Sequence, residues 1–536
     1  MKIVVPEKIS PRGIQEFQNE PGWQVVQLTP ASVQSGELAR ELADADALVV
    51  RSAVKVTPEL LESAPKLRVI GRAGIGVDNV NLEAATRKGI VVMNTPGGSS
   101  SSVAELAIGM MIALARKLCL ADALTRAGKW EKKSLQGSEL EGKTLGVLGL
   151  GRIGMELARR ARAFSMQVVA YDPFASPVAA REAGVKLLTM DEVMAQSDYI
   201  SLHMALTPET ESILNAANLA KMKKGVRIIN CARGELIDEN ALIDALKSGQ
   251  VGGVALDVFR KEPPGEHPLF ALPNVIATPH VAGSTDEAQE RVGYRIAVQI
   301  KEYLAQGIIQ NAVNVPSVGF EEYKELQPWM ALGEKLGALL AQLAPGQPRE
   351  LALRYGGELA EMNTGLIRNS VLTGVLNRAF SSDDKANIIN AKAVAEQRGV
   401  ALHEGKWENS RGLARSLSVM LKTDKEELTL QGAVLHGSSP RLVGIDDIDI
   451  EAPLGERLLI MRNDDVPGVI GHVGSVLGKR GINIASFSLG RQEANGSAQK
   501  PLRAVAVVQV DADVTDEVIT ELKQFNAVHF AQLVRL

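Results

Sequence analysis

The chain has 536 residues, of which 45% are hydrophobic and 23% charged, with a formal net charge of -4 and two cysteines. This length exceeds what one hydrophobic core supports, so about three or four domains are expected. The small net charge excludes a general attraction to nucleic acid or anionic membrane surfaces. Cys119 and Cys231 stand far apart and the histidines are scattered, so we expect neither a disulfide framework nor a bound metal.

The N-terminus leads directly into a short β-branched run at residues 2–6, without the apolar core of a signal peptide. The longest apolar helical stretch, residues 106–115, is bounded by charged residues and is shorter than the ~18 residues that span a bilayer. These features predict a cytoplasmic protein.

The first 96 residues alternate short strand-like runs with polar, helix-compatible segments. The strand-like runs are residues 2–6, 23–27, 47–50, 69–71 and 91–94. Such alternation predicts βα units and a parallel sheet.

The most informative motif is GLGRIG at residues 149–154, between a strand-like run at 144–148 and a helix-like run at 155–164. In this context the motif predicts a dinucleotide site, with the pyrophosphate at the helix N-terminus. The residues expected to bind the cofactor there are Gly149, Gly151, Arg152, Ile153 and Gly154. A loop that is merely rich in glycine is the alternative interpretation.

Asp172 ends the next apolar run, at residues 168–171. A carboxylate at this point accepts hydrogen bonds from a ribose diol and repels a 2′-phosphate, which favours NAD over NADP. The alternative is a solvated aspartate at a strand end.

Further strand-like runs at 199–203, 227–231, 253–258 and 275–278 continue a doubly wound pattern, and a helical stretch at 287–304 is expected to pack on the first segment.

Unusual polar residues stand at three of these strand ends, in the stretches 230–234, 257–263 and 278–280. Ligands of open α/β sheets bind outside the carboxyl ends of strands, so the three stretches are expected to converge. His280 suits the role of general base, with Glu262 orienting its ring. Arg233 suits a bidentate contact with a substrate carboxylate. Each of these residues taken alone could equally be a surface charge.

The alternation of strand-like and helix-like runs ends at residues 313–328, where three Pro or Gly residues predict a linker. Helical periodicity follows at 332–343 and 386–395, with a strand candidate at 427–435. The last segment, residues 458–534, predicts a βαββαβ order, which is the ferredoxin-like arrangement.

These stretches resemble the signature motifs of the D-isomer-specific 2-hydroxyacid dehydrogenases. The matching sequences are GRAGIGVDN at 71–79, GLGRIG at 149–154, NCARG at 230–234, DVFRKEPP at 257–264, TPH at 278–280 and EAQ at 287–289. The resemblance implies that Arg233, Glu262 and His280 are catalytic. It also implies cofactor contacts for Cys231 and Asp257, the latter with the nicotinamide carboxamide.

The whole chain resembles the long members of this family, which implies an α/β fold with four domains. A split, flavodoxin-like substrate-binding domain would comprise residues 1–96 and 281–314, and a Rossmann NAD-binding domain residues 97–280. An intervening α+β regulatory domain would span 316–452 and a ferredoxin-like ACT domain 456–536. Arg51, Arg72 and Gly74 would bind substrate, the two arginines supplying cations for a phosphate group.

The ACT resemblance rests on NDDVPG at 463–468 and GINI at 481–484. It implies that Asp465 and Asn483 bind an amino-acid effector, L-serine, with Asn463 as a weaker candidate. A cluster of turn-forming side chains is the equally plain alternative. In the intervening domain only Arg441 stands out as a residue for an anionic effector.

The activity that the resemblance implies is NAD-dependent oxidation of 3-phospho-D-glycerate to 3-phosphohydroxypyruvate, the first step of L-serine biosynthesis, with feedback by serine and a homotetrameric assembly. One alternative is another 2-hydroxyacid dehydrogenase, for example a 2-oxoglutarate reductase, and a second is an amino-acid sensor without catalysis. The chain departs from the family pattern at Ser99, Glu235 and Ala282-Gly283, which changes local backbone shape and removes no catalytic group.

Overall fold

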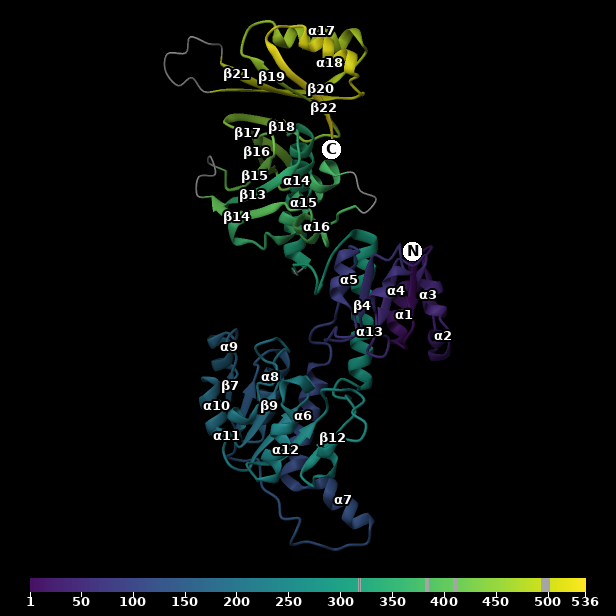
Figure 1. Cartoon of the computed structure of the whole chain (residues 1–536), viewed down its shortest axis with the longest axis vertical. Coiled ribbons are helices and arrows are strands. Elements are labelled where there is room, and N and C mark those ends of the chain that lie inside the picture. The colour runs from purple at the N-terminus through teal and green to yellow at the C-terminus, as the bar shows by residue number, and fades with distance from the viewer. Residues whose placement is uncertain (317, 319, 381–384, 408–412, 493–501) are drawn as a thin grey trace.

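The computed structural model describes all residues except 317, 319, 381–384, 408–412 and 493–501. The described chain forms an elongated molecule with four sheets, each in its own part of the chain (Figure 1). The C-terminal part lies at one end, followed by the middle part, and the part with the Gly-rich motif lies at the other end (Figure 1). The N-terminal part lies between the middle part and the Gly-rich part.

The first sheet has five parallel strands in the order β2-β1-β3-β4-β5. The strands are β1 (Lys2–Val5), β2 (Gln24–Gln27), β3 (Ala47–Val50), β4 (Val69–Arg72) and β5 (Val91–Met93), as the β-branched runs predict. Its helices are α1 (Pro11–Gln18), α2 (Pro30–Gln34), α3 (Glu37–Leu42), α4 (Pro58–Glu62) and α5 (Leu82–Arg87).

The chain returns to this sheet much later, through α13 (Asp286–Gln306), which packs against α1. Two glycines allow the close approach, because a Cβ on Gly13 would lie 2.5 Å from the carbonyl oxygen of Gly293. The helical stretch predicted at 287–304 therefore exists and covers the first segment, as expected.

The second sheet has seven parallel strands in the order β12-β11-β10-β9-β6-β7-β8. They are β6 (Thr144–Leu148), β7 (Gln167–Tyr171), β8 (Lys186–Leu187), β9 (Tyr199–Leu202), β10 (Val226–Asn230), β11 (Val251–Leu256) and β12 (Val275–Ala277). The accompanying helices are α6 (Ser100–Arg116), α7 (Leu118–Arg126), α8 (Arg152–Ala163), α9 (Pro177–Glu182), α10 (Met190–Gln196), α11 (Ala216–Ala220) and α12 (Glu239–Lys247). The order reverses between β6 and β9, which is the switch point where such sheets bind ligands. The doubly wound prediction is confirmed.

The middle part is a mixed sheet in the order β14-β13-β15-β16-β17-β18, covered by helices. The strands are β13 (Pro348–Gly357), β14 (Ala401–Trp407), β15 (Arg415–Thr423), β16 (Glu427–Leu435), β17 (Ser439–Ile445) and β18 (Ile448–Pro453). The helices are α14 (Phe320–Leu343), α15 (Gly365–Ala379) and α16 (Ala391–Gln397).

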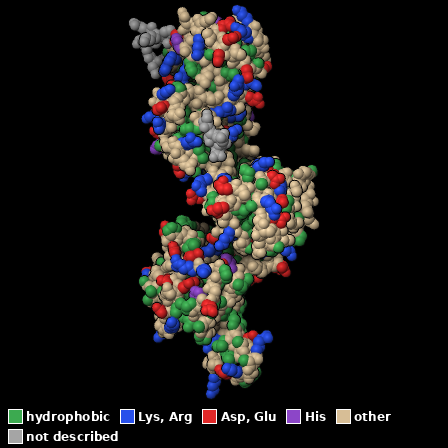
Figure 2. All heavy atoms as spheres, turned by 45° about the vertical axis from the view of Figure 1, so that its right-hand side comes forward, with side chains coloured by type: hydrophobic (Ala, Val, Ile, Leu, Met, Phe, Trp, Pro, Cys, Tyr) green, Lys and Arg blue, Asp and Glu red, His purple; other side chains and the backbone are tan. Residues whose placement is uncertain are grey.

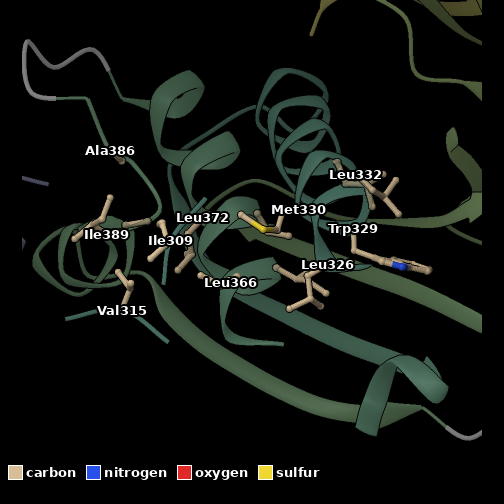
Figure 3. Close-up of a cluster of buried hydrophobic side chains, with 14 of the residues drawn as sticks. Ile309, Val315, Leu326, Trp329, Met330, Leu332, Leu366, Leu372, Ala386 and Ile389 are labelled. Atoms are coloured by element: carbon tan, nitrogen blue, oxygen red, sulfur yellow. The ribbon is translucent and has the colours of Figure 1, made fainter. Parts of the chain in front are cut away.

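The linker predicted to extend to Pro328 is wrong in its second half, because α14 begins at Phe320 and continues through Pro328. Burial explains why a helix tolerates proline there. Leu326 is fully buried, and Trp329 and Met330 are at most 9% exposed. Figure 3 shows these side chains gathered with Leu366 and Leu372 of α15. The apolar area that α14 buries outweighs the ~3 kcal/mol that an interior proline costs a helix.

The same hydrophobic cluster joins the middle part to the first sheet. Ile309 and Val315, which follow α13, lie in it with Ala386 and Ile389 (Figure 3). A polar contact reinforces the joint, since Asn387 Nδ2 donates to the carbonyl oxygen of Gly89, just after α5, over 2.9 Å. These two parts of the molecule therefore share a continuous core.

The C-terminal part is a four-stranded antiparallel sheet in the order β20-β21-β19-β22 with two helices. Its elements are β19 (Arg457–Asp464), α17 (Val469–Lys479), β20 (Ile484–Arg491), β21 (Arg503–Val510), α18 (Asp516–Lys523) and β22 (Val528–Arg535). The predicted βαββαβ order is confirmed.

Candidate active site

A cavity of about 870 Å³ lies between the first and second sheets and collects residues from the carboxyl ends of strands in both. The predicted site residues that line it are Arg51, Arg72, Gly74, Ile153, Cys231, Arg233, Glu262 and His280. The strand ends that the sequence analysis expected to converge therefore do so, and they meet two arginines from the first sheet.

His280 and Glu262 contact each other at the wall of this cavity. His280 Nδ1 lies 2.7 Å from Glu262 Oε2, and Glu262 Oε1 accepts the backbone N–H of Phe259 over 3.1 Å. The carboxylate fixes the imidazole orientation and leaves Nε2 for a ligand. A histidine held in this way can accept a proton at Nε2 while the carboxylate stabilises the resulting cation.

The backbone at His280 is left-handed, with φ +53°, a conformation that non-glycine residues seldom adopt. The buried carboxylate of Asp257 holds this loop in place. It accepts hydrogen bonds from the Thr278 hydroxyl over 2.6 Å and from the N–H groups of Val281 and Ala282 over 2.8 Å each. Asp257 does not line the cavity, so its observed contacts are with the loop that carries His280.

Arg233 lies in the cavity after the end of β10. Its Nη1 donates to the carbonyl oxygen of Ala232 over 2.7 Å, and its Nη2 donates to Asp78 Oδ2 over 2.8 Å. The turn is tight, because a Cβ on Gly234 would overlap the backbone of Phe259. This close packing of the β10 and β11 ends sets Arg233 and Glu262 beside the same cavity.

Arg51 and Arg72 supply further positive charge from the first sheet. The Arg51 loop is held by Glu7, whose carboxylate accepts the N–H of Arg51 over 2.8 Å and that of Ala53 over 2.9 Å. Arg72 Nε is buried and has no hydrogen-bond partner within the described residues. Burial and the nearby Arg233 lower the pKa of Arg72 from its usual value. An unpaired, buried guanidinium N–H facing two other cations suits an anionic ligand.

The Gly-rich turn fits a dinucleotide. Gly149 has φ +96°, and a Cβ there would lie 2.6 Å from the carbonyl carbon of His203, so only glycine is accommodated. Gly154 packs its Cα against the Gly149 carbonyl oxygen, whereas a Cβ on Gly151 would meet nothing within 4 Å. The N-terminus of α8 has no side-chain cap. Free N–H groups that face open space are what a pyrophosphate requires.

Asp172 lies at the end of β7, beside this turn. Its Oδ2 accepts the N–H of Leu150 over 2.8 Å and its Oδ1 accepts that of Phe174 over 2.8 Å. Both contacts fix the carboxylate next to the turn and leave lone pairs for a ribose diol. Arg152, the first residue of α8, is exposed beside the same turn.

Cys231 lines the cavity as an uncharged thiol. Burial and the nearby Asp257 raise the pKa of the Cys231 thiol, and its Sγ lies 3.8 Å from Met110 Sδ. Such a side chain offers packing and not a nucleophile. No group of three or more His, Cys, Asp or Glu residues in the described part of the chain is arranged to hold a metal ion.

Three residues of the cavity or its supports escaped the sequence analysis, namely Glu7, Asp78 and His203. His203 follows β9, and Ser201 Oγ lies 2.8 Å from its Nε2. Burial lowers the pKa of His203 to about 4. Its Nδ1 is buried and unpaired within the described residues. The signal available in the sequence was the position of Glu7 and His203 just after strands, and for Asp78 its place in the GRAGIGVDN motif.

The predicted effector residues in the C-terminal part make contacts within the chain. Asp465 Oδ1 lies 3.3 Å from Arg491 Nε, and Asn483 Nδ2 donates to Asp511 Oδ2 over 2.8 Å. Asn463 is buried with an unpaired Oδ1, and the Nε of Arg441 in β17 is likewise buried and unpaired in the described structure.

The visible face of the molecule mixes both signs of charge, without a broad basic patch (Figure 2). In the described residues, we find no helix with the length and apolar character needed to cross a membrane.

Three family models match the chain in succession. Residues 108–282 match the D-isomer specific 2-hydroxyacid dehydrogenase NAD binding domain, 325–446 the D-3-phosphoglycerate dehydrogenase intervening domain, and 457–527 the ACT domain.

Similar proteins cover the full length. D-3-phosphoglycerate dehydrogenase of Methanocaldococcus jannaschii is 41% identical over 93% of this chain and 94% of its own. The enzyme of Archaeoglobus fulgidus is 40% identical over 100% of both chains. Among solved structures, D-lactate dehydrogenase from Aquifex aeolicus complexed with NAD and lactic acid aligns with a TM-score of 0.51 and 30% identity, over 59% of this chain and 100% of that one. Because relatives at 40% identity or more match nearly the whole chain, the chain belongs to the D-3-phosphoglycerate dehydrogenase family.

Proposed function

We propose that the protein oxidises 3-phospho-D-glycerate to 3-phosphohydroxypyruvate with NAD, the first step of L-serine biosynthesis. The observation that carries this proposal is the single cavity that joins the His280–Glu262 pair to Arg233 and to Arg51 and Arg72. The relatives over the full chain bear the name of this enzyme. A sensor without catalysis is not favoured, since the acid–base pair is complete. A 2-oxoglutarate reductase is not favoured, since the relatives over the full chain bear the name of D-3-phosphoglycerate dehydrogenase.

The roles of the residues follow from the geometry. When bound, NAD supplies the acceptor for the hydride that leaves C2 of the substrate. His280 accepts the C2 hydroxyl proton at Nε2, and Glu262 stabilises the imidazolium through Nδ1–H. Arg233 holds the substrate carboxylate and polarises the developing carbonyl oxygen. Arg51 and Arg72 hold the phosphate group against Gly74, where the backbone leaves room for the Arg72 guanidinium.

The cofactor-binding residues and the domain boundaries predicted from the sequence are part of this proposal. Gly149, Gly151, Arg152, Ile153 and Gly154 would bind the pyrophosphate and Asp172 the adenosine ribose. Cys231 would line the nicotinamide end, and Asp257, which does not line the cavity, would act there through the loop that carries His280. The proposed domains are 1–96 with 281–314 for substrate, 97–280 for NAD, 316–452 for the intervening domain and 456–536 for the ACT domain.

We further propose a cytoplasmic homotetramer that serine regulates through Asp465 and Asn483. Support for self-association comes from α7, which buries none of its residues within the chain and leaves Leu118 49% exposed. An apolar helix of this kind is expected to pack on a second copy. Support for an effector comes from the match to the ACT domain.

The test is NADH oxidation by the purified protein with 3-phosphohydroxypyruvate, in the wild type and in His280→Asn. We expect rapid turnover in the wild type and a loss of about 10²–10⁴-fold in kcat for the variant, because the proton donor at Nε2 is removed. NADH binding, measured by its fluorescence, is the control and should not change. Addition of serine should slow the wild type. Turnover with another 2-keto acid in place of this one would contradict the proposed substrate.

A further inference from the structure

Asp78 contacts Arg233 across the boundary between the two sheets. Asp78 follows β4 in the first sheet and Arg233 follows β10 in the second, and Asp78 Oδ2 lies 2.8 Å from Arg233 Nη2. Arg233 is the residue that the proposed function assigns to the substrate carboxylate. An aspartate that already binds this guanidinium therefore needs an explanation.

The backbone is shaped to hold this ion pair. A Cβ on Gly76 would overlap Arg233 Nη2 and would lie 2.7 Å from Asp78 Oδ2. The pair therefore rests directly on the Gly76 backbone, where any side chain would displace it. This arrangement distinguishes the contact from an incidental surface pair.

Stability does not account for the contact. The Asp78 side chain is 70% exposed and that of Arg233 29% exposed. Exposed ion pairs contribute little to folding. What the contact does provide is orientation, because the Arg233 guanidinium is held at Nη1 by the Ala232 carbonyl and at Nη2 by Asp78. Of the five N–H groups of an arginine, three remain for a ligand after these two contacts.

We propose that Asp78 is a positioning residue for Arg233, which holds the guanidinium across the cleft with its remaining N–H groups available to the carboxylate of a 2-hydroxy or 2-keto acid. The inference rests on the proposed function only for the choice of substrate, since all such acids carry that carboxylate. The Asp78 contact also makes the orientation of the Arg233 guanidinium depend on the relative position of the two sheets. The reason is that Ala232 follows a strand of the second sheet and Asp78 a strand of the first.

The experiment compares Asp78→Ala and Asp78→Asn with the wild type in full-length protein, by steady-state reduction of 3-phosphohydroxypyruvate with NADH. We expect kcat/KM to fall about 10–100-fold in Asp78→Ala, as for other small misplacements of a binding group. Asp78→Asn should fall less, since its carbonyl oxygen still accepts an N–H. NADH affinity and thermal stability should stay at wild-type values. Asp191→Asn, which breaks the exposed pair between Asp191 of α10 and Lys221 at the end of α11, is the matched control and should leave kcat/KM unchanged.

A double-mutant cycle tests whether Asp78 acts through Arg233. In an Arg233→Lys background, Asp78→Ala should cost less than about threefold, because the group it positions is already altered. An equal cost in both backgrounds would overturn the proposal. So would a rise in kcat/KM in Asp78→Asn, which would make Asp78 a competitor of the substrate carboxylate.

Failure of the positioning role of Asp78 can be distinguished from failure of the proposed function. If the wild type reduced 2-oxoglutarate and not 3-phosphohydroxypyruvate, the proposed substrate would be wrong and the same cycle would be run on 2-oxoglutarate. If no acid were reduced, binding of 3-phosphohydroxypyruvate to the protein–NADH complex would replace kcat/KM. Equal binding by the wild type and Asp78→Ala would then overturn the positioning role.

Discussion

Two histidines beside the cavity lie in opposite environments. The His280 side chain is 49% exposed and pairs with Glu262, whereas His203 is half-buried beside Ser201 and has no carboxylate partner among the described residues. The first can gain a proton during the reaction, because its cation has a counter-charge. The second stays neutral, because burial penalises its charged form. Two strand ends of the same sheet thus place one residue type in different environments, with His280 proposed for chemistry and His203 for packing.

The neutral state of His203 predicts a pH-dependent stability. Burial lowers its pKa from 6.5 to about 4, so the unfolded chain binds a proton between these values and the folded chain does not. The contribution of neutral His203 to the free energy of unfolding is therefore complete above pH 6.5 and is lost as the pH falls toward 4. Relative to His203→Gln, the wild type should lose about 2 kcal/mol more of its free energy of unfolding between pH 7 and about pH 4.5.

Urea unfolding at the two pH values measures this difference in the free energy of unfolding. The transition to follow is the one that NADH shifts to higher urea concentration, because that transition reports the unfolding of the cofactor-binding part. Parallel losses in the wild type and His203→Gln would show that His203 is protonated in the folded protein.

At the scale of elements, the turn between β6 and α8 uses its glycines for different purposes. Gly154 lies against the Gly149 carbonyl oxygen, so its role is to let the helix approach the strand. Gly151 faces open space, so its role concerns the ligand. A single GxGxxG motif therefore combines a requirement of the fold with a requirement of binding.

Two alanine substitutions separate these requirements. Gly154→Ala should lower thermal stability, by about 1–3 kcal/mol, because a methyl group is forced against backbone. Gly151→Ala should leave stability unchanged in the absence of ligand and weaken NADH binding at least about tenfold, because the methyl group occupies the space for the pyrophosphate. Thermal unfolding and NADH fluorescence titration measure the two effects. A stable Gly151→Ala protein that binds NADH normally would place the pyrophosphate elsewhere.

The sequence predicted elements well where local pattern and burial agree. The β-branched runs became β1 to β5, and the strand predicted at 427–435 became β16. The prediction failed at α14, where Pro328 argued for a linker but the burial of neighbouring side chains kept the helix. Local composition could not reveal this, because the partners of α14 lie on α15 and on the segment that follows α13.

Site residues divide in the same way. Arg233, Glu262 and His280 stood out because they follow strand ends within specific motifs. Glu7 is an ordinary acidic residue in sequence, and Asp78 is one residue of the GRAGIGVDN motif. The contacts of Asp78 with Arg233 and of Glu7 with the Arg51 backbone are created only by the fold.

At the scale of the whole molecule, the active site depends on the placement of two sheets that the chain visits in the order first, second, first. α13 returns from the His280 loop to pack on α1, so the end of the second sheet is tied to the first. The first sheet in turn shares a hydrophobic core with the middle part, to which Asn387 adds a contact at the end of α5. A change in the middle part therefore has a physical route to the sheet that carries Arg51, Arg72 and Asp78.

We propose that the crevice selects a phosphorylated 2-keto acid. The most direct measurement is the ratio of kcat/KM for 3-phosphohydroxypyruvate to that for hydroxypyruvate, in the wild type and in Arg72→Gln. The wild type should prefer the phosphorylated substrate strongly. Arg72→Gln should lose about 10–100-fold on that substrate, the worth of one charged hydrogen bond, and little on hydroxypyruvate. Equal use of both substrates by the wild type, or equal losses on both in Arg72→Gln, would contradict a phosphate site at Arg72.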